Sequence, residues 1–214
     1  EPQSVITSKH DRPGWRNTDI FAFVNAGLFG FMCATVYYAR FVTYRGVGNL
    51  HEFFFYAAAI LSAIALGAFF LRRLNWPTWL LILVQAGILA HFAGAFLPID
   101  GGRLYDAEFF SVRYDKYVHA FNALAGAALV AHLLSHANAR LPARPAVILL
   151  TVLGGGAVVE ILEYLVTITV PHSGVGDYDN NMQDLISNLV GAAAYVIFLD
   201  LRRRFYRWRH PGRA

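Results

Sequence analysis

The chain has 214 residues, of which 57% are hydrophobic and only 15% are charged, and its formal net charge is +4 at pH 7. Its mean hydropathy of +0.42 lies outside the range of water-soluble domains, so the composition excludes a soluble fold and predicts an all-α polytopic membrane protein. The basic excess does not predict a nucleic-acid partner, because Lys and Arg flank the apolar segments instead of gathering in a domain of their own.

Six apolar segments are long enough to cross a bilayer at the helical rise of about 1.5 Å per residue. They comprise residues 20–41, 53–71, 77–97, 114–136, 146–170 and 181–201. Because the loops are short, we predict a single bundle of six transmembrane helices over residues 19–204, between an N-terminal arm (residues 1–18) and a basic, aromatic tail (residues 205–214). Lys and Arg concentrate in both terminal segments and in the second and fourth loops, so the positive-inside rule predicts that both termini are cytoplasmic.

The first two predicted helices carry almost no polar chemistry. Away from its ends, the first has Asn25 as its one strongly polar residue, and Ser62 lies near the centre of the second. We therefore expect these helices to serve as scaffold, or as a surface for membrane lipids and other membrane subunits. Cys33 is the only cysteine in the chain, so no disulfide is expected and a packing role is the simplest interpretation.

The third predicted helix and the loop after it differ from the first two. Gly87, His91 and Gly94 recur at helical spacing and share one stripe. A lone histidine in a span is often only a hydrogen-bonded packing residue. The loop of residues 98–113 mixes acidic, basic and aromatic side chains, which is typical either of a solvated loop or of a lid at the membrane interface.

The last three predicted helices each align polar side chains. Asp115 and His119 share one face of the fourth helix, and Glu160 and Glu163 lie one turn apart in the fifth. The face predicted for the sixth helix consists of Asn181, Asp184, Asn188, Gly191 and Tyr195. A charge at membrane depth is costly, so acids in these helices are candidates for function.

Six titratable side chains from four helices fall in the same half of the predicted bundle. They are His91, Asp115, His119, Glu160, Glu163 and Asp184. In one interpretation they bind a divalent metal, as helical bundles do at carboxylate sites, and the oxygen-rich set favours Zn, Fe, Mn or Mg. In a second, the buried carboxylates share protons as a relay. In a third, Arg113, Lys116 and His119 neutralise the acids as a structural ion-pair network.

Short motifs follow one another along the second half of the chain. They are His91-x-x-Gly94, Gly101-Gly102-x-x-Tyr105, Tyr114-Asp115-Lys116-x-x-His119, Glu160-x-x-Glu163, and Gly176-Asp177 followed at seven-residue steps by Asp184 and Gly191. In this order they resemble the YjdF-like family, whose pattern has an aspartate where this chain has Asn180. The resemblance implies a six-helix, multi-pass protein of the bacterial inner membrane and brings no established activity. A fainter likeness to VanZ-like proteins points to the cell envelope.

The function that we predict is a metal-dependent enzyme acting on a lipid or another hydrophobic molecule. The predicted metal ligands are His119, Glu160, Glu163 and Asp184. The predicted catalytic residues are His91, as a general base or further ligand, and Asp115, which would orient His119 or add a ligand.

Two other functions remain open. A non-enzymatic subunit of a larger membrane complex would use the first two helices as its partner surface. Its histidines, with His132 and His136 among them, would then hold haem or a pigment. A proton-coupled transporter would use the acids as a relay, although the sequence shows no internal repeat and no helix broken at its middle.

Overall fold

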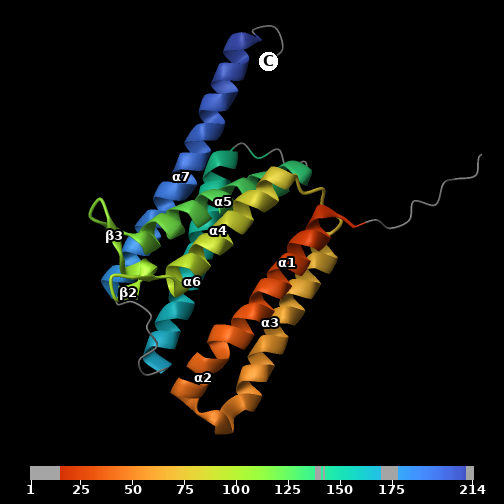
Figure 1. Cartoon of the computed structure of the whole chain (residues 1–214). Coiled ribbons are helices and arrows are strands. Elements are labelled where there is room, and N and C mark those ends of the chain that lie inside the picture. The colour runs from red at the N-terminus through yellow and green to blue at the C-terminus, as the bar shows by residue number, and fades with distance from the viewer. Residues whose placement is uncertain (1–14, 138–140, 142, 170–177, 211–214) are drawn as a thin grey trace, which may run out of the picture. The chain divides into compact units, whose positions relative to one another are not determined.

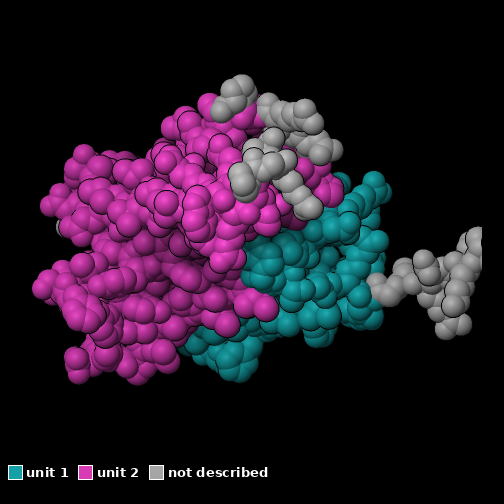
Figure 2. Space-filling model, turned by 90° about the horizontal axis from the view of Figure 1, so that it is seen from above, with its two compact units in different colours: residues 1–81 teal, residues 82–214 magenta. Residues whose placement is uncertain are grey.

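The computed structural model describes residues 15–137, 141, 143–169 and 178–210. Over these residues the chain forms long helices (Figure 1), and six helical segments are long and apolar enough to cross a membrane. The six predicted helices are thereby confirmed, while the single bundle and the cytoplasmic termini stay predictions. The chain divides into two compact units, residues 1–81 and residues 82–214 (Figure 2). Most of the predicted N-terminal arm and the Gly176-Asp177 motif lie outside the described residues.

The first unit is a helical hairpin. Its elements are α1 (Asn17–Met32), a π-helical turn (Cys33–Tyr37), α2 (Tyr38–Arg45), a 3-10 turn (Val47–Asn49) and α3 (Leu50–Leu71). An ion pair of 2.9 Å between Arg45 and Glu52 closes one end of the hairpin, and one of 3.0 Å between Arg72 and Asp19 closes the other. α3 buries none of its residues, so its apolar side chains are left for lipid or another chain to cover.

The second unit is built on three packed helices, α5 (Tyr114–His136), α6 (Arg144–Thr169) and α7 (Tyr178–Arg209). Their buried core is made mainly of small side chains: Ala123, Ala127, Ala131, Ile148 and Ala192. Gly191 of α7 lies directly against the backbone of Ala120 in α5, where an added Cβ would be 2.6 Å from the Ala120 carbonyl carbon. Small residues allow such close approach between membrane helices, and here it brings the polar faces of α5 and α7 together.

Two small hairpins connect α4 (Thr78–Phe96) to α5. The strands are β1 (Pro98–Ile99), β2 (Gly102–Arg103), β3 (Glu108–Phe109) and β4 (Val112–Arg113). β1 pairs with β2 and β3 pairs with β4, both antiparallel. A 3-10 turn, Leu104–Asp106, joins the two hairpins, and its Tyr105 ring occupies the space beside Gly94 of α4.

α7 continues well past the end that hydropathy predicts. Four residues of its predicted polar face, Asn181, Asp184, Asn188 and Gly191, are buried, as their spacing predicts. Beyond residue 201, where the apolar segment stops, the helix runs on to Arg209 (Figure 1). The arginines of the predicted tail are therefore carried on the same continuous helix, up to that residue.

Candidate functional site

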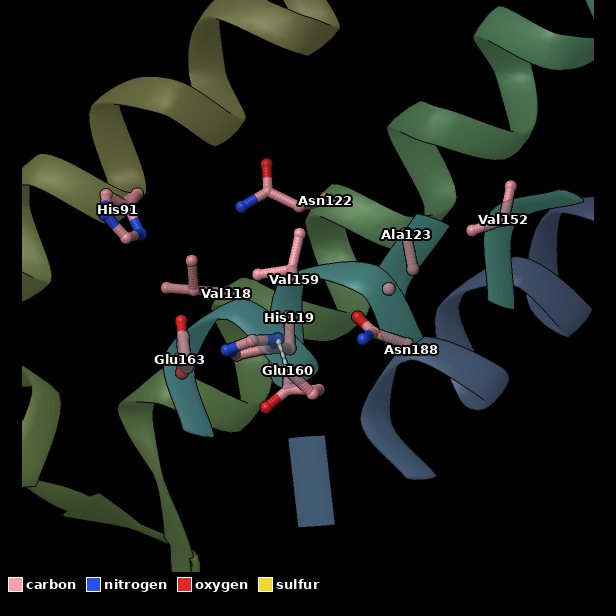
Figure 3. A pocket seen from close by; sticks show the side chains of 11 residues that line it. His91, Val118, His119, Asn122, Ala123, Val152, Val159, Glu160, Glu163 and Asn188 are labelled. Carbon is pink, nitrogen blue, oxygen red and sulfur yellow. Dashed lines mark ion pairs between the residues drawn. The ribbon is translucent and has the colours of Figure 1, made fainter. Parts of the chain in front are cut away.

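A cavity of about 270 Å³ in the second unit is lined from α4, α5, α6 and α7. Its polar lining consists of His91, His119, Asn122, Glu160, Glu163 and Asn188 (Figure 3). The rest of the described lining is valine, alanine and glycine, with no Lys or Arg. The structure thus brings four of the six predicted site residues, His91, His119, Glu160 and Glu163, to one cavity.

Asp184 joins two of these residues in a tighter group. The imidazole Nδ1 of His119 lies 3.9 Å from Glu160 Oε1, and its Nε2 lies 3.4 Å from Asp184 Oδ1. One ligand atom from each of the three residues lies within 4.8 Å of the other two. Metal–ligand bonds of about 2.0–2.2 Å place opposite ligands about 4 Å apart, so the spacing is close to that needed around one ion.

Asp184 is also part of an ion-pair network. Lys116 Nζ donates to Asp184 Oδ1 at 2.8 Å and to Asn180 Oδ1 at 2.8 Å, and Asn180 Nδ2 donates to Asp184 Oδ2 at 2.8 Å. Asp115 Oδ2 lies 3.2 Å from Lys116 Nζ and 3.3 Å from Arg113 Nη2. The structure therefore places Asp115, which the sequence suggests as a partner of His119, against these two cations.

The cations of this network neutralise three aspartates but neither glutamate of the cavity. Its ion pairs join the cations of Arg103, Arg113 and Lys116 to the carboxylates of Asp106, Asp115 and Asp184. Within the described part of the chain, Glu160 and Glu163 have no ion pair with Lys or Arg, and both carboxylate oxygens of Glu160 lack a hydrogen-bond partner. Leaving a buried polar group without a partner destabilises a protein by about 1–3 kcal/mol, and a charged group by more. The structural ion-pair interpretation therefore accounts for the aspartates but not for the glutamates.

His91 is held by the loop after α4. Its Nδ1 is hydrogen-bonded to the Tyr105 hydroxyl. Burial, followed by the negative charge of Asp115, raises the pKa of the Tyr105 phenol above its usual range, so the hydroxyl stays protonated at neutral pH. The sequence marks Tyr105 only as a motif residue, because nothing in the spacing of a loop shows which helix it will contact. His132 and His136 lie one turn apart on α5, with tilted rings whose centroids are 6.4 Å apart, and they do not line the cavity.

Comparison with protein families decides the relationship of this chain. Residues 26–205 match the family described as a predicted membrane protein, DUF2238. The chain belongs to the DUF2238 family. This is the YjdF-like family that the motifs resemble, whereas no VanZ-like match supports the fainter likeness. The DUF2238 match covers every residue of the candidate site.

No curated protein and no solved structure matches the chain. Membership of DUF2238 together with six candidate spans establishes a multi-pass membrane protein. The family description names no activity, so the cavity is the feature of this DUF2238 protein that bears on its chemistry.

Proposed function

We propose that the cavity holds a divalent metal ion and that the protein is a metal-dependent enzyme of the bacterial inner membrane. The observation that carries this proposal is Glu160, whose side chain is only 5% exposed. Neither of its carboxylate oxygens has a hydrogen-bond partner among the described residues, yet it faces His119 and lies close to Asp184. A divalent cation would supply the two positive charges that Glu160 and Glu163 lack.

The proposed ligands are His119, Glu160 and Asp184, with Glu163 of the same cavity as a fourth. One imidazole nitrogen with several carboxylate oxygens suits Zn, Fe or Mn, and Mg less well. Asp184 would keep its bonds to Lys116 and Asn180, because a carboxylate offers about four lone-pair positions. Lys116 would then be a positioning residue, and Asp115 would act through it.

The proposed substrate is a neutral lipid or another hydrophobic molecule with one hydrogen-bonding group. Apolar side chains make up much of the cavity wall, and the amides of Asn122 and Asn188 offer donors and acceptors beside the carboxylates. A bound metal would polarise a carbonyl oxygen of such a molecule. His91 would serve as the general base through Nε2 when its Nδ1–H donates to the Tyr105 oxygen.

Metal analysis tests this proposal first. The detergent-purified protein, stripped with a chelator and reloaded in turn with Zn, Mn, Fe and Mg, is expected to retain one ion per chain by mass spectrometry. Glu160→Gln should abolish retention, whereas Glu108→Gln, the same change at an exposed carboxylate in β3, should not. If a folded wild-type protein retains none of the four metals, the proposal is wrong and proton sharing between the glutamates becomes the better explanation.

Turnover tests the enzymatic part separately. Wild-type protein loaded with the retained metal is incubated with a bacterial lipid extract, and the products are followed by mass spectrometry. A lipid product that forms with wild type and not with Glu160→Gln supports the enzyme. Stoichiometric metal without any lipid product would keep the metal site and remove the proposed substrate class.

A haem- or pigment-binding subunit is the second candidate function. It is favoured by one observation, that His91 and His119 line the same cavity. Its partner surface would be the apolar side chains of α1 and α3, which membrane lipids would otherwise cover. An absorbance band in the visible range that is lost in His119→Ala, or membrane subunits that copurify, would support this candidate over the enzyme.

A further inference from the structure

The two hairpins between α4 and α5 share one design but differ in their turn residues. Each has a two-residue turn between paired strands, and both residues of each turn have positive φ. The angles are 47° at Asp100 and 79° at Gly101 in the first hairpin, and 51° at Phe110 and 61° at Ser111 in the second. Asp-Gly is a sequence that such turns favour. A bulky phenylalanine is unfavourable there, because its Cβ crowds the backbone in the left-handed region.

Among the described residues, no side chain covers this unfavourable phenylalanine. The Phe110 side chain is 98% exposed, and its neighbours Phe109 and Val112 are 41% and 40% exposed. We call these three residues the Phe110 tip. A strained, fully exposed aromatic residue flanked by apolar ones indicates a surface that something outside the chain covers.

The position of the tip indicates what covers it. β4 runs without a break into α5, a candidate membrane span, and the Tyr117 hydroxyl donates to the Phe109 carbonyl oxygen at 2.7 Å. Because Tyr117 lies about one turn inside α5, the hairpin is held beside the first turn of the span, where Figure 1 shows it projecting. Tyr117 is itself 42% exposed. The tip therefore continues the surface that α5 presents to the bilayer.

We propose that the Phe110 tip inserts into the lipid bilayer at the boundary between headgroups and acyl chains. Phenylalanine is among the side chains that surface-bound helices bury at this depth, and burial of the tip there offsets the cost of a left-handed phenylalanine. The first hairpin, with Asp100 at the equivalent turn position, stays in water. Insertion anchors the loop that carries Tyr105 to the membrane surface, and it does so whether or not the cavity binds metal.

Site-directed fluorescence tests the insertion. Cys33 is the only cysteine, so a Cys33→Ala background allows an environment-sensitive dye to be placed by Phe110→Cys or, as the matched control, by Asp100→Cys. Both labelled full-length proteins are reconstituted in phosphatidylcholine vesicles, with and without lipids that carry a spin label near the headgroup. The control reports any tendency of the dye itself to enter the bilayer, because both turns have the same length and left-handed conformation.

The dye at residue 110 is expected to emit at shorter wavelength than the dye at residue 100 and to be quenched several-fold more strongly by the spin-labelled lipid. Equal, water-like emission at both positions would overturn the proposal. Shorter-wavelength emission at residue 110 without lipid quenching would also overturn it, because a second protein chain would then cover the tip. If Phe110→Cys does not fold, the same comparison is made with Ser111→Cys.

Discussion

Replacing Gly191 by alanine tests the helix contact on which the candidate site depends. A Cβ at this position would lie 2.6 Å from the Ala120 carbonyl carbon and 2.9 Å from its Cα, whereas ordinary contact begins at 3.4 Å. The nearest atom is the Ala120 carbonyl oxygen, so the obstacle is backbone, a rotamer change cannot relieve it, and α5 and α7 must separate. Overpacking of this kind costs typically about 1–3 kcal/mol, or about 4–8 °C in Tm for a loss of about 2 kcal/mol in a chain of this size.

Thermal unfolding in detergent, followed by the fluorescence of the 4 tryptophans, measures this loss. The matched control is Gly154→Ala in α6, where no described atom lies within 4 Å of the added Cβ, so its Tm should stay within a degree or two of wild type. Gly191→Ala should also weaken metal retention, because separation of the helices lengthens the 3.4 Å distance between the proposed ligands His119 and Asp184. Equal melting temperatures for the two alanine variants would refute the close packing of α5 against α7.

Three further outcomes are expected. Lys116→Met leaves Asp184 buried without its cation and should lower the free energy of unfolding by about 3–5 kcal/mol. Lys116→Arg, which keeps the charge, should have a higher Tm than Lys116→Met. Equal Tm values for these two variants would contradict the buried ion pair. A chelator should lower the Tm of metal-loaded wild type and leave the Tm of Glu160→Gln unchanged. If the metal is present at about 100 times its Kd, its removal should lower the free energy of unfolding of wild type by about 2.7 kcal/mol. Because burial raises the pKa of Tyr105, the stabilisation by its protonated hydroxyl is complete below about pH 10, the ordinary pKa of tyrosine, and declines above it. Tyr105→Phe should therefore lose less stability than wild type between neutral and strongly alkaline pH in the same thermal assay.

Hydropathy predicts the helices well where an apolar run and a helix end at the same place. α5 spans Tyr114–His136, the bounds that the sequence predicts, since polar and charged residues flank the run. Hydropathy does not predict the end of a helix where the apolar run stops before the helix does. Arginine and aromatic residues are compatible with a helix, so α7 continues to Arg209 although apolarity stops near residue 201. The π-helical turn at Cys33–Tyr37 also escapes prediction, because it leaves the apolar pattern unchanged.

Helical spacing predicts which residues of the candidate site share a helix face but not which partners they take. Periodicity on separate helices correctly aligns His119 and Asp184, which the close contact of α5 and α7 then brings within 3.4 Å. It also puts Asp115 on the same face as His119, yet the Asp115 carboxylate pairs with Lys116 and Arg113. Asp115 takes these partners because Arg113 lies in β4 and Lys116 is its neighbour on α5, and a rule about residues that share a helix face contains no information about either cation.

The unbroken course of α7 has a mechanical consequence. Its 32 residues extend about 48 Å at about 1.5 Å per residue, whereas the hydrocarbon core of a bilayer is about 30 Å thick. Asp184 lies near one end of this helix and Arg209 is the last residue at the other end, so both belong to one continuous helix. A tilt of about 5° displaces the far end of such a rod by about 4 Å. Because α7 is one continuous helix between them, a displacement of the arginines is expected to change the position of Asp184 beside the cavity.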